Sequence, residues 1–183
     1  MANWLNEAKV VDAAVYAAVA GTETPSLDIA MRRLSRAADQ SKIWFGAAAA
    51  IALLGGSGGR RTATRGLVSL GLASGFANIV AKPLTVRRRP DREQLKVLAA
   101  RHVPMPRSSS FPSGHAASAF AFATGAGRIQ PALSAPLRAL ATLVGYSRVH
   151  TGVHYPADVL AGAFIGVSAA ELAGRLLEAR AAL

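Results

Sequence analysis

Three stretches of this sequence, far apart along the chain, contain the residue types that bind and transfer phosphate. They are KPLTVRRRP at 82–90, PSGH at 112–115 and SRVHTGVHYPAD at 147–158. Together they supply fixed cations, a helix start that can bind an anion, histidines and a carboxylate. These groups are sufficient to hydrolyse a phosphate ester without a metal ion, because the reaction needs a nucleophile, an acid and positive charge around the phosphoryl group.

The first stretch offers two cations next to prolines. Lys82 ends an apolar run and precedes Pro83, and Arg89 precedes Pro90 in an extended connection. Lysine supplies a point charge and arginine a planar fork, and both stabilise the charge on the oxygens of a phosphoryl group during transfer. Taken alone, this stretch is more typical of a solvated basic loop or of an anchor for lipid headgroups.

The second stretch predicts the start of a helix. Ser113 is a good N-cap, and Gly114 lets the backbone approach a ligand closely. The free N–H groups of a helix start bind anions, so His115 would lie beside a bound phosphate and could donate a proton to a leaving oxygen. By itself the motif fits a plain capped helix with a half-buried histidine equally well.

The third stretch contains a further cation, Arg148, and a histidine with a carboxylate partner. Pro156 suits the first turn of a helix, which places Asp158 within one turn of His154. A carboxylate that holds one imidazole nitrogen fixes the tautomer and presents the other nitrogen as a nucleophile. His150, which lies between them, is interpreted as a local structural residue.

The four histidines also raise the question of a metal site. His150 and His154 are separated by four residues, a spacing that can serve zinc on a helix. The surrounding arginines disfavour a divalent cation by repulsion, so we expect no metal. His102 lies in the basic connection with no motif around it, and we expect it to face solvent.

Five uncharged runs rich in alanine and glycine must position these residues. Each is close to or below the roughly 20 residues that cross the hydrocarbon core of a bilayer. Their recurrence, without strand-like alternation, predicts an all-α fold: a membrane helical bundle of about five transmembrane helices. A soluble all-helical core is the alternative. The runs are 43–59, 66–81, 113–127, 139–147 with a backward extension past Arg138, and 159–170.

Two of the runs contain paired glycines four residues apart. Gly71 and Gly75 form one pair, and Gly162 and Gly166 form the other. Small residues at this spacing let membrane helices approach closely. The two pairs therefore predict tight helix contacts, although each glycine could also be an ordinary flexible one.

The length of 183 residues predicts a single domain, 1–183, in two parts. Residues 43–183 would form the membrane core with the three stretches, and residues 1–42 would form amphipathic N-terminal helices. A break is expected at 22–25, and the segment 27–36 has helical spacing with a basic face. We expect this segment to lie on a bilayer surface or to pack on the bundle.

The formal charge of +11 is concentrated in one connection. Between Lys82 and Pro112 there are eight basic and two acidic residues, which account for +6 of the total. This segment contains almost no aromatic residues for stacking on bases, which argues against nucleic acid as a partner. Other arginines fall at the opposite helix ends, and because such residues stay cytoplasmic we expect the site on the extracytoplasmic side. They are Arg60, Arg61, Arg65, Arg128, Arg175 and Arg180.

The order and spacing of the three stretches resemble the motifs of the type 2 phosphatidic acid phosphatase superfamily. The matching pattern is Lys, six residues, Arg-Pro; then Pro-Ser-Gly-His; then Ser-Arg, five residues, His, three residues, Asp. The resemblance covers 82–158 without a departure and does not extend to the first 40 residues. It implies that the phosphoryl group is bound by Lys82, Arg89, Ser113, the Gly114 backbone and Arg148.

The resemblance also implies how the histidines act. His154 would be the nucleophile that forms a phosphohistidine, Asp158 its orienting partner, and His115 the acid that releases the leaving group. No metal or other cofactor is implied. The composition resembles that of small actinobacterial members, which implies an integral protein of a bacterial cell membrane.

The implied function is hydrolysis of a lipid-linked phosphate monoester or diphosphate in a membrane. Candidate substrates are phosphatidic acid, phosphatidylglycerophosphate, polyprenyl diphosphate and polyprenyl phosphoribose phosphate, and the motifs do not choose among them. Vanadate-dependent haloperoxidases and soluble acid phosphatases share the same site but are longer and less apolar. A third alternative is a non-catalytic membrane protein that binds anionic lipid headgroups. The oligomeric state is left open.

Overall fold

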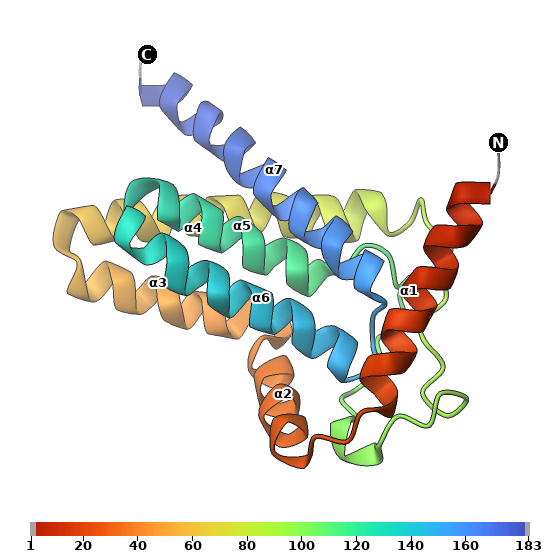
Figure 1. Ribbon diagram of the computed structural model, residues 1–183. Helices are drawn as coiled ribbons and strands as arrows, with labels where there is room; N and C mark the ends of the chain where they lie inside the picture. The colour runs from red at the N-terminus through yellow and green to blue at the C-terminus, as the bar shows by residue number, and fades with distance from the viewer. Residues whose placement is uncertain (1–2, 182–183) are drawn as a thin grey trace.

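The computed structural model describes residues 3–181 of the chain and, within that range, contains helices and no strands (Figure 1). The predicted all-α fold is confirmed. Two N-terminal helices precede five helices that form a bundle, and short helical turns lie in the connections. The helices are α1 Asn3–Gly21, α2 Pro25–Ala37, α3 Lys42–Leu54, α4 Gly56–Gly75, α5 Gly114–Ile129, α6 Ser134–His150 and α7 Pro156–Ala181. The turns are η1 Asp39–Ser41, η2 Phe76–Ala81, η3 Ala99–Arg101 and η4 Pro131–Leu133.

The bundle is built around α5, which packs against α4, α6 and α7 (Figure 1). Eleven of the sixteen residues of α5 are buried, and most of these are alanine or glycine, so neighbouring backbones come close. Phe122 is the largest fully buried side chain on this helix and contacts Trp44 of α3, with ring centroids 5.4 Å apart. Four of the five predicted apolar runs each correspond to one helix from α4 to α7, although the run 66–81 continues past the end of α4 through η2. The first run is interrupted.

That interruption corrects the predicted run at 43–59. Helix α3 ends at Leu54, and α4 begins at Gly56, which has a φ of 56°. This left-handed conformation is open to glycine at no steric cost, so the chain reverses here instead of continuing as one helix. Within the described part of the chain one helix is long and apolar enough to cross a membrane, over Pro156–Arg180, with a mean hydropathy of 1.5.

The two glycine pairs behave differently. A Cβ atom on Gly162 would lie 2.4 Å from the Ser113 carbonyl oxygen, and one on Gly166 would lie 2.4 Å from the Ala117 carbonyl oxygen. Only glycine fits there, so the predicted close contact is confirmed between α7 and α5. A Cβ on Gly71 or Gly75 would meet no heavy atom within 4 Å among the described residues. The prediction of a tight contact is wrong for this pair within the bundle.

The N-terminal segment has the predicted break, and the chain is non-helical at 22–24. Its second helix, α2, packs on the bundle against α6, which is one of its two predicted places, but part of its apolar pattern stays outside. Leu27 and Ile29 are exposed, whereas Asp28 is buried. The reason is electrostatic: Asp28 Oδ1 lies 2.8 Å from Arg101 Nε and 2.8 Å from His150 Nε2, and a buried arginine needs such a partner.

The long connection between η2 and α5 crosses the end of the bundle where α1 also lies (Figure 1). Arg101 in this connection is fully buried and donates to the carbonyl oxygens of Val19 and Ala20 at the end of α1. Arg92 donates to the carbonyl oxygens of Val103 and Gly152. These hydrogen bonds hold the connection in one position over the helix ends, and this is where the three predicted stretches meet.

Candidate active site

A cavity of about 220 Å³ opens at this end of the bundle. Five of the eight predicted site residues line it, although they come from four separate segments of the chain: Lys82, Arg89, Gly114, His115 and His154. The remaining lining includes Trp44, Ser74, Asn78 and Ser118 from α3, α4, η2 and α5. The structure therefore brings the three sequence stretches to one space.

A π-helical turn brings Lys82 to the cavity. In η2 the hydrogen bonding widens, so that Lys82 N donates to the Ala77 carbonyl oxygen five residues back, at 3.1 Å. The Lys82 ammonium donates to Asn78 Oδ1 at 2.7 Å. A Cβ on Gly114 would lie 3.2 Å from that same amide oxygen, so glycine permits the close approach of η2 to the start of α5. Burial, reinforced by the charges of Arg89 and Arg148, lowers the pKa of Lys82.

His154 and Asp158 form the central pair of the site. His154 Nδ1 faces Asp158 Oδ2 at 3.5 Å, within ion-pair range but longer than a usual hydrogen bond. Both side chains are buried. The other ring nitrogen, Nε2, lies 3.3 Å from an Arg89 guanidinium nitrogen on the cavity side. The imidazole is therefore placed between a carboxylate on one nitrogen and a cation on the other.

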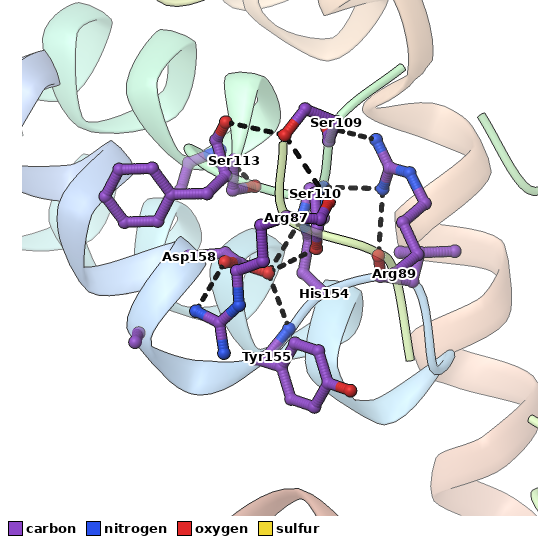
Figure 2. Close-up of polar contacts among 12 residues, drawn as sticks. Arg87, Arg89, Ser109, Ser110, Ser113, His154, Tyr155 and Asp158 are labelled. Carbon is purple, nitrogen blue, oxygen red and sulfur yellow. Dashed lines mark hydrogen bonds and ion pairs between the residues drawn. The ribbon is translucent and has the colours of Figure 1, made fainter. Parts of the chain in front are cut away.

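Asp158 is held by three donors besides its contact with the histidine (Figure 2). Arg87 donates to Oδ1 at 3.0 Å, the Tyr155 backbone N–H donates to Oδ2 at 2.9 Å, and the Ser110 hydroxyl donates to Oδ2. Such donors fix a carboxylate in one orientation and favour its charged form. Asp158 is thus a rigid acceptor for the Nδ1 side of His154.

Arg87 is itself positioned by α1. Its second guanidinium nitrogen pairs with Asp12, and the guanidinium carbon lies 4.4 Å from the centre of the Tyr155 ring. Asp12 also accepts a hydrogen bond from Ala157 N, in the first turn of α7, at 2.8 Å. The carboxylate at this helix start complements the helix dipole. Helix α1 therefore clamps the loop that carries Arg87 to the helix that carries Asp158.

Arg89 is oriented by backbone carbonyls. It donates to Ser108 O at 3.0 Å, to Ser109 O at 3.1 Å and to Val153 O at 2.8 Å. Burial lowers the pKa of Arg89, although the Asp158 carboxylate opposes this shift. The usual pKa of a guanidinium lies so far above neutral pH that Arg89 stays charged. These bonds fix a positive charge beside His154 Nε2 (Figure 2).

The electrostatic setting keeps the His154 ring neutral. Burial lowers its pKa, the Arg89 and Arg148 charges lower it further, and the Asp158 interaction only partly compensates, so that the pKa is about 4. The neutral ring has a lone pair on the nitrogen that does not carry the proton. With Asp158 on the Nδ1 side, that lone pair is on Nε2, which faces the cavity.

The second histidine has a carboxylate of its own. His115 Nε2 lies 3.0 Å from Asp39 Oδ1 in η1. The same oxygen is 3.7 Å from a guanidinium nitrogen of Arg148, whose buried side chain also donates to the Ser35 hydroxyl. The hydrogen bond from His115 lowers the pKa of Asp39 more than burial raises it, with help from the Arg148 charge. Asp39 is therefore a carboxylate that joins the predicted acid to the predicted third cation.

The remaining predicted residues have plainer surroundings. Ser113 is buried and its hydroxyl caps α5 by accepting from Ala116 N at 3.5 Å. His150 is buried, and its two ring nitrogens form hydrogen bonds with Asp28 and with the Tyr146 hydroxyl, which fits a structural residue. His102 is half-buried and its Nε2 lies 3.0 Å from Val97 O, which corrects the expectation that it faces solvent. Among residues 3–181 there is no group of three or more His, Cys, Asp or Glu side chains that could hold a metal ion.

Several residues of the site were not predicted from the sequence. Ser110 stands two residues before Pro112, and Arg87 two before Arg89, so both lie close to motifs and could have been suspected from that position. Asp12 and Asp39 lie in the N-terminal 42 residues, which carry no motif. Nothing in their local pattern indicates a role in the site, because each acts through a contact with a distant part of the chain.

Comparisons with known proteins agree on the kind of protein this chain resembles. Residues 63–181 match the sequence profile of the family described as the PAP2 superfamily. A decaprenylphosphoryl-5-phosphoribose phosphatase from Mycolicibacterium smegmatis is 35% identical over 156 residues, which are 81% of this chain and 77% of that protein.

Two solved structures are similar in fold, each at 25% identity. LpxE of Aquifex aeolicus has a TM-score of 0.73 over 88% of this chain and 93% of its own. A transmembrane PAP2-type phosphatidylglycerolphosphate phosphatase from Bacillus subtilis has a TM-score of 0.71 over 94% of this chain and 87% of its own. The likeness therefore extends over most of the helices described above.

Proposed function

This chain belongs to the PAP2 superfamily of phosphatases, and on that basis we propose that it is an integral membrane enzyme that hydrolyses a lipid-linked phosphate through a phosphohistidine. The observation that carries the proposal is the setting of His154. Its Nδ1 faces a buried carboxylate, and its Nε2 faces the cavity beside a fixed guanidinium. A neutral imidazole in this setting has what a nucleophile needs.

The phosphoryl group would bind in the cavity among fixed positive charges. Lys82 and Arg89 line this space, and Arg148 is buried beside Asp39. The start of α5 adds backbone N–H groups at Gly114 and the positive end of the helix dipole. These donors stabilise the negative charge that spreads over the non-bridging oxygens during transfer.

In the first step the lone pair of His154 Nε2 attacks phosphorus, and the bond from phosphorus to the ester oxygen breaks. The ester oxygen leaves with the bonding electrons and takes a proton from His115, so the leaving group departs as an alcohol. Asp158 stabilises the positive charge that develops on the His154 ring. In the second step water attacks the phosphohistidine and gives a proton to His115, which releases inorganic phosphate and restores both histidines.

The outer surface of the bundle supports a membrane location. Large apolar side chains point outward at several levels of the helices, among them Leu54 at the far end and Ile79 and Phe164 nearer the site, all more than 70% exposed. Phe76 and Val80 line one hollow together with Phe164 and Leu172 of α7, so the exposed apolar surface is contiguous there, and such a surface is unfavourable in water. We propose that α3 to α7 are the five transmembrane helices, although α3, with 13 residues, is short for a full crossing.

We infer the orientation of the bundle in the membrane from the charges at the ends of its helices. Arg60 and Arg61 lie near the start of α4 and Arg65 lies halfway along it, whereas the cavity is lined by Ser74 at the end of this helix. The positive-inside tendency then places these arginines in the cytoplasm and the active site on the extracytoplasmic side. We propose this side of a bacterial cell membrane.

The substrate class follows from the relatives. The substrate named for the Mycolicibacterium relative is a polyprenyl phosphoribose phosphate, and the one named for the Bacillus structure is phosphatidylglycerolphosphate. We propose that this chain acts on a lipid of this kind, with polyprenyl phosphoribose phosphate as the first to test. Phosphatidic acid and polyprenyl diphosphate are the other candidates.

The test is phosphate release from these four lipids by the full chain in an uncharged detergent with EDTA present. We expect release from at least one lipid, loss of release by at least a thousandfold in His154→Ala, and unchanged thermal unfolding of that variant. A substrate labelled with ³²P in the reacting phosphate should leave base-stable, acid-labile label on the native protein and none on His154→Ala. Release from none of the lipids, or full turnover by His154→Ala, would contradict the proposal.

A further inference from the structure

A second hollow of about 400 Å³ lies directly beside the cavity and is lined by four arginines. It shares Arg89 and Pro106 with the cavity, so the two spaces adjoin at that arginine. No acidic residue is among the described residues that line it. We refer to it as the arginine hollow, and its lining consists of Thr85, Val86, Arg87, Arg88, Arg89, Met105, Pro106, Arg107, Ser108 and Ser109.

Two antiparallel stretches of the long connection build this hollow. Ser110 N donates to the Arg87 carbonyl oxygen at 2.9 Å, and Arg89 donates to the Ser109 carbonyl oxygen at 3.1 Å. The hydroxyls of Thr85 and Ser109 are 3.1 Å apart. These hydrogen bonds tie residues 85–89 to residues 109–110, directly after Arg107, which lines the hollow together with the three consecutive arginines. The hollow therefore has a fixed frame.

The four arginines are not equivalent. Arg87 is paired with Asp12 and Asp158, and Arg89 is occupied by carbonyl oxygens. Arg88 and Arg107 are exposed and make no ion pair with any of residues 3–181. Two guanidinium groups thus remain available in a space without acidic lining, and a guanidinium binds phosphate oxygens through its planar fork. The hollow has the chemistry of a second phosphate site.

The rim of the hollow indicates where its ligand comes from. Val86 is 97% exposed, and Met105 is also exposed, on the same two stretches as the arginines. Apolar side chains among arginines are typical of a surface at the depth of lipid headgroups. A phosphate bound there would belong to a lipid, and the shared Arg89 puts it within one headgroup of the phosphate in the catalytic cavity.

We propose that the arginine hollow binds a second phosphate of the same substrate molecule, through Arg88 and Arg107. The substrate would then carry a phosphodiester in the hollow and a phosphate monoester in the cavity, and lipids with a single phosphate would bind less well. This inference rests on the proposed function, because it takes the cavity as the place of hydrolysis. Arg88 and Arg107 would then contribute to substrate specificity without taking part in the chemical step.

The test compares two lipids that share a diacylglycerol and differ in the second phosphate. Phosphatidylglycerophosphate has a phosphodiester and a monoester, and phosphatidic acid has the monoester alone. In Arg88→Ala/Arg107→Ala we expect KM to rise roughly tenfold for phosphatidylglycerophosphate and to change less than about twofold for phosphatidic acid, as two exposed charge contacts would give. The value of kcat should stay the same for both lipids.

A control variant carries the same change of charge at the opposite end of the bundle. Arg60 and Arg61 are exposed at the start of α4, and Arg60→Ala/Arg61→Ala should leave both KM values unchanged. An equal rise of KM for both lipids in Arg88→Ala/Arg107→Ala would mean that the arginines attract anionic lipid surfaces in general, and it would overturn the proposal. Unchanged KM values for both lipids would also overturn it.

A binding measurement separates this inference from the proposed function. Both lipids are titrated in micelles against His154→Ala, and against the same protein with Arg88→Ala/Arg107→Ala added. Selective loss of phosphatidylglycerophosphate binding supports the second phosphate site, even if the native chain releases phosphate from neither lipid. Equal binding of that lipid by both proteins would overturn the site, even if phosphate release proceeds as proposed.

Discussion

The two sides of the catalytic cavity each pair a histidine with a carboxylate, but they hold the carboxylate differently. On one side Asp158 is fully buried and accepts from Arg87, Ser110 and the Tyr155 backbone in addition to facing His154. On the other side the Asp39 side chain is 39% exposed and contacts only His115 and Arg148 within ion-pair distance among the described residues.

The difference fits two different tasks. A nucleophile must keep one tautomer and one orientation, which a buried and fully bonded carboxylate secures. A proton donor must exchange protons with a leaving group and with water, which a partly exposed carboxylate permits. Asp39 also precedes Gln40 and Ser41, which have φ values of 55° and 60°. This uncommon backbone conformation in two residues without a glycine marks the acid side as the more strained of the two.

The largest effect is expected on the nucleophile side. In Asp158→Asn the amide cannot stabilise a positive His154 ring or enforce its tautomer, so we expect kcat to fall on the order of a thousandfold. The measurement is phosphate release from phosphatidic acid and from p-nitrophenyl phosphate, and both should fall alike because both need the nucleophile.

The matched control for this variant is Asp91→Asn. Asp91 is an exposed carboxylate in the long connection between η2 and α5, where it accepts from the backbone N–H groups of Glu93 and Gln94. Its turnover should match the native value. A loss of less than about tenfold in Asp158→Asn would contradict the orienting role.

A smaller and substrate-dependent effect is expected on the acid side. In Asp39→Asn the charge that favours a protonated His115 is lost, so kcat for a lipid substrate should fall roughly thirtyfold. p-Nitrophenolate leaves without a proton, so its release should fall by less than about threefold. His115→Gln should show the same contrast between substrates. Equal losses on both substrates would mean that Asp39 only supports the fold.

These two sides were not equally predictable from the sequence. His154 and Asp158 lie four residues apart, and one turn of helix brings them together, so local spacing was sufficient. His115 was found through its motif, but its partner Asp39 lies 76 residues away in the chain. Ser35, which accepts from Arg148, is 113 residues away from it in the chain, and Asp12, which accepts from Ala157 N, is 145 residues away from Ala157. Contacts between residues so far apart in the sequence leave no trace in its local periodicity.

The errors in the fold have the same origin. The segment 27–36 packs on the bundle, which is one of its two predicted places, but Leu27 and Ile29 of its apolar pattern stay exposed because the buried Arg101 of a distant loop pairs with Asp28. The five helical runs were predictable because each depends on its own composition. The break after Leu54 was not, because glycines at 55 and 56 are common within apolar runs and only the packing of α3 on α4 requires a reversal there.

A still smaller effect tests how far the rigidity of Asp158 depends on α1. In Arg87→Gln the carboxylate loses one of its donors but keeps Ser110 and the Tyr155 backbone, so kcat for phosphatidic acid should fall roughly fivefold to tenfold with KM unchanged. Arg87→Lys should recover part of the loss. Asp12→Asn should act in the same direction, and the double variant should be no worse than Arg87→Gln because the residues act in series.

The neighbouring residue supplies the control. Arg88→Gln makes the same chemical change one position away, at a side chain without an ion pair to the described residues, and it should leave turnover of phosphatidic acid unchanged. A rise in KM without a change in kcat for Arg87→Gln would mean that this arginine binds substrate directly instead of positioning Asp158.

The last prediction concerns the charge of the His154 ring and involves no loss of activity. Because burial and the nearby arginines lower its pKa to about 4, the ring should remain neutral as the pH falls from 8 to about 5, and it should take up a proton only below that range. The lowered pKa means that the folded protein binds this proton less readily than the unfolded chain, whose histidines titrate near 6.5. The neutral His154 ring therefore contributes to folding stability above about pH 6.5, and this contribution is lost as the pH falls toward 4.

The measurement is a ¹⁵N titration of histidine-labelled protein in micelles, with the His154 ring signal identified among the four by its absence from His154→Ala. A His154 titration near pH 6.5 would show that water reaches the ring in the free enzyme, and the contrast between a sealed nucleophile side and an open acid side would then fail.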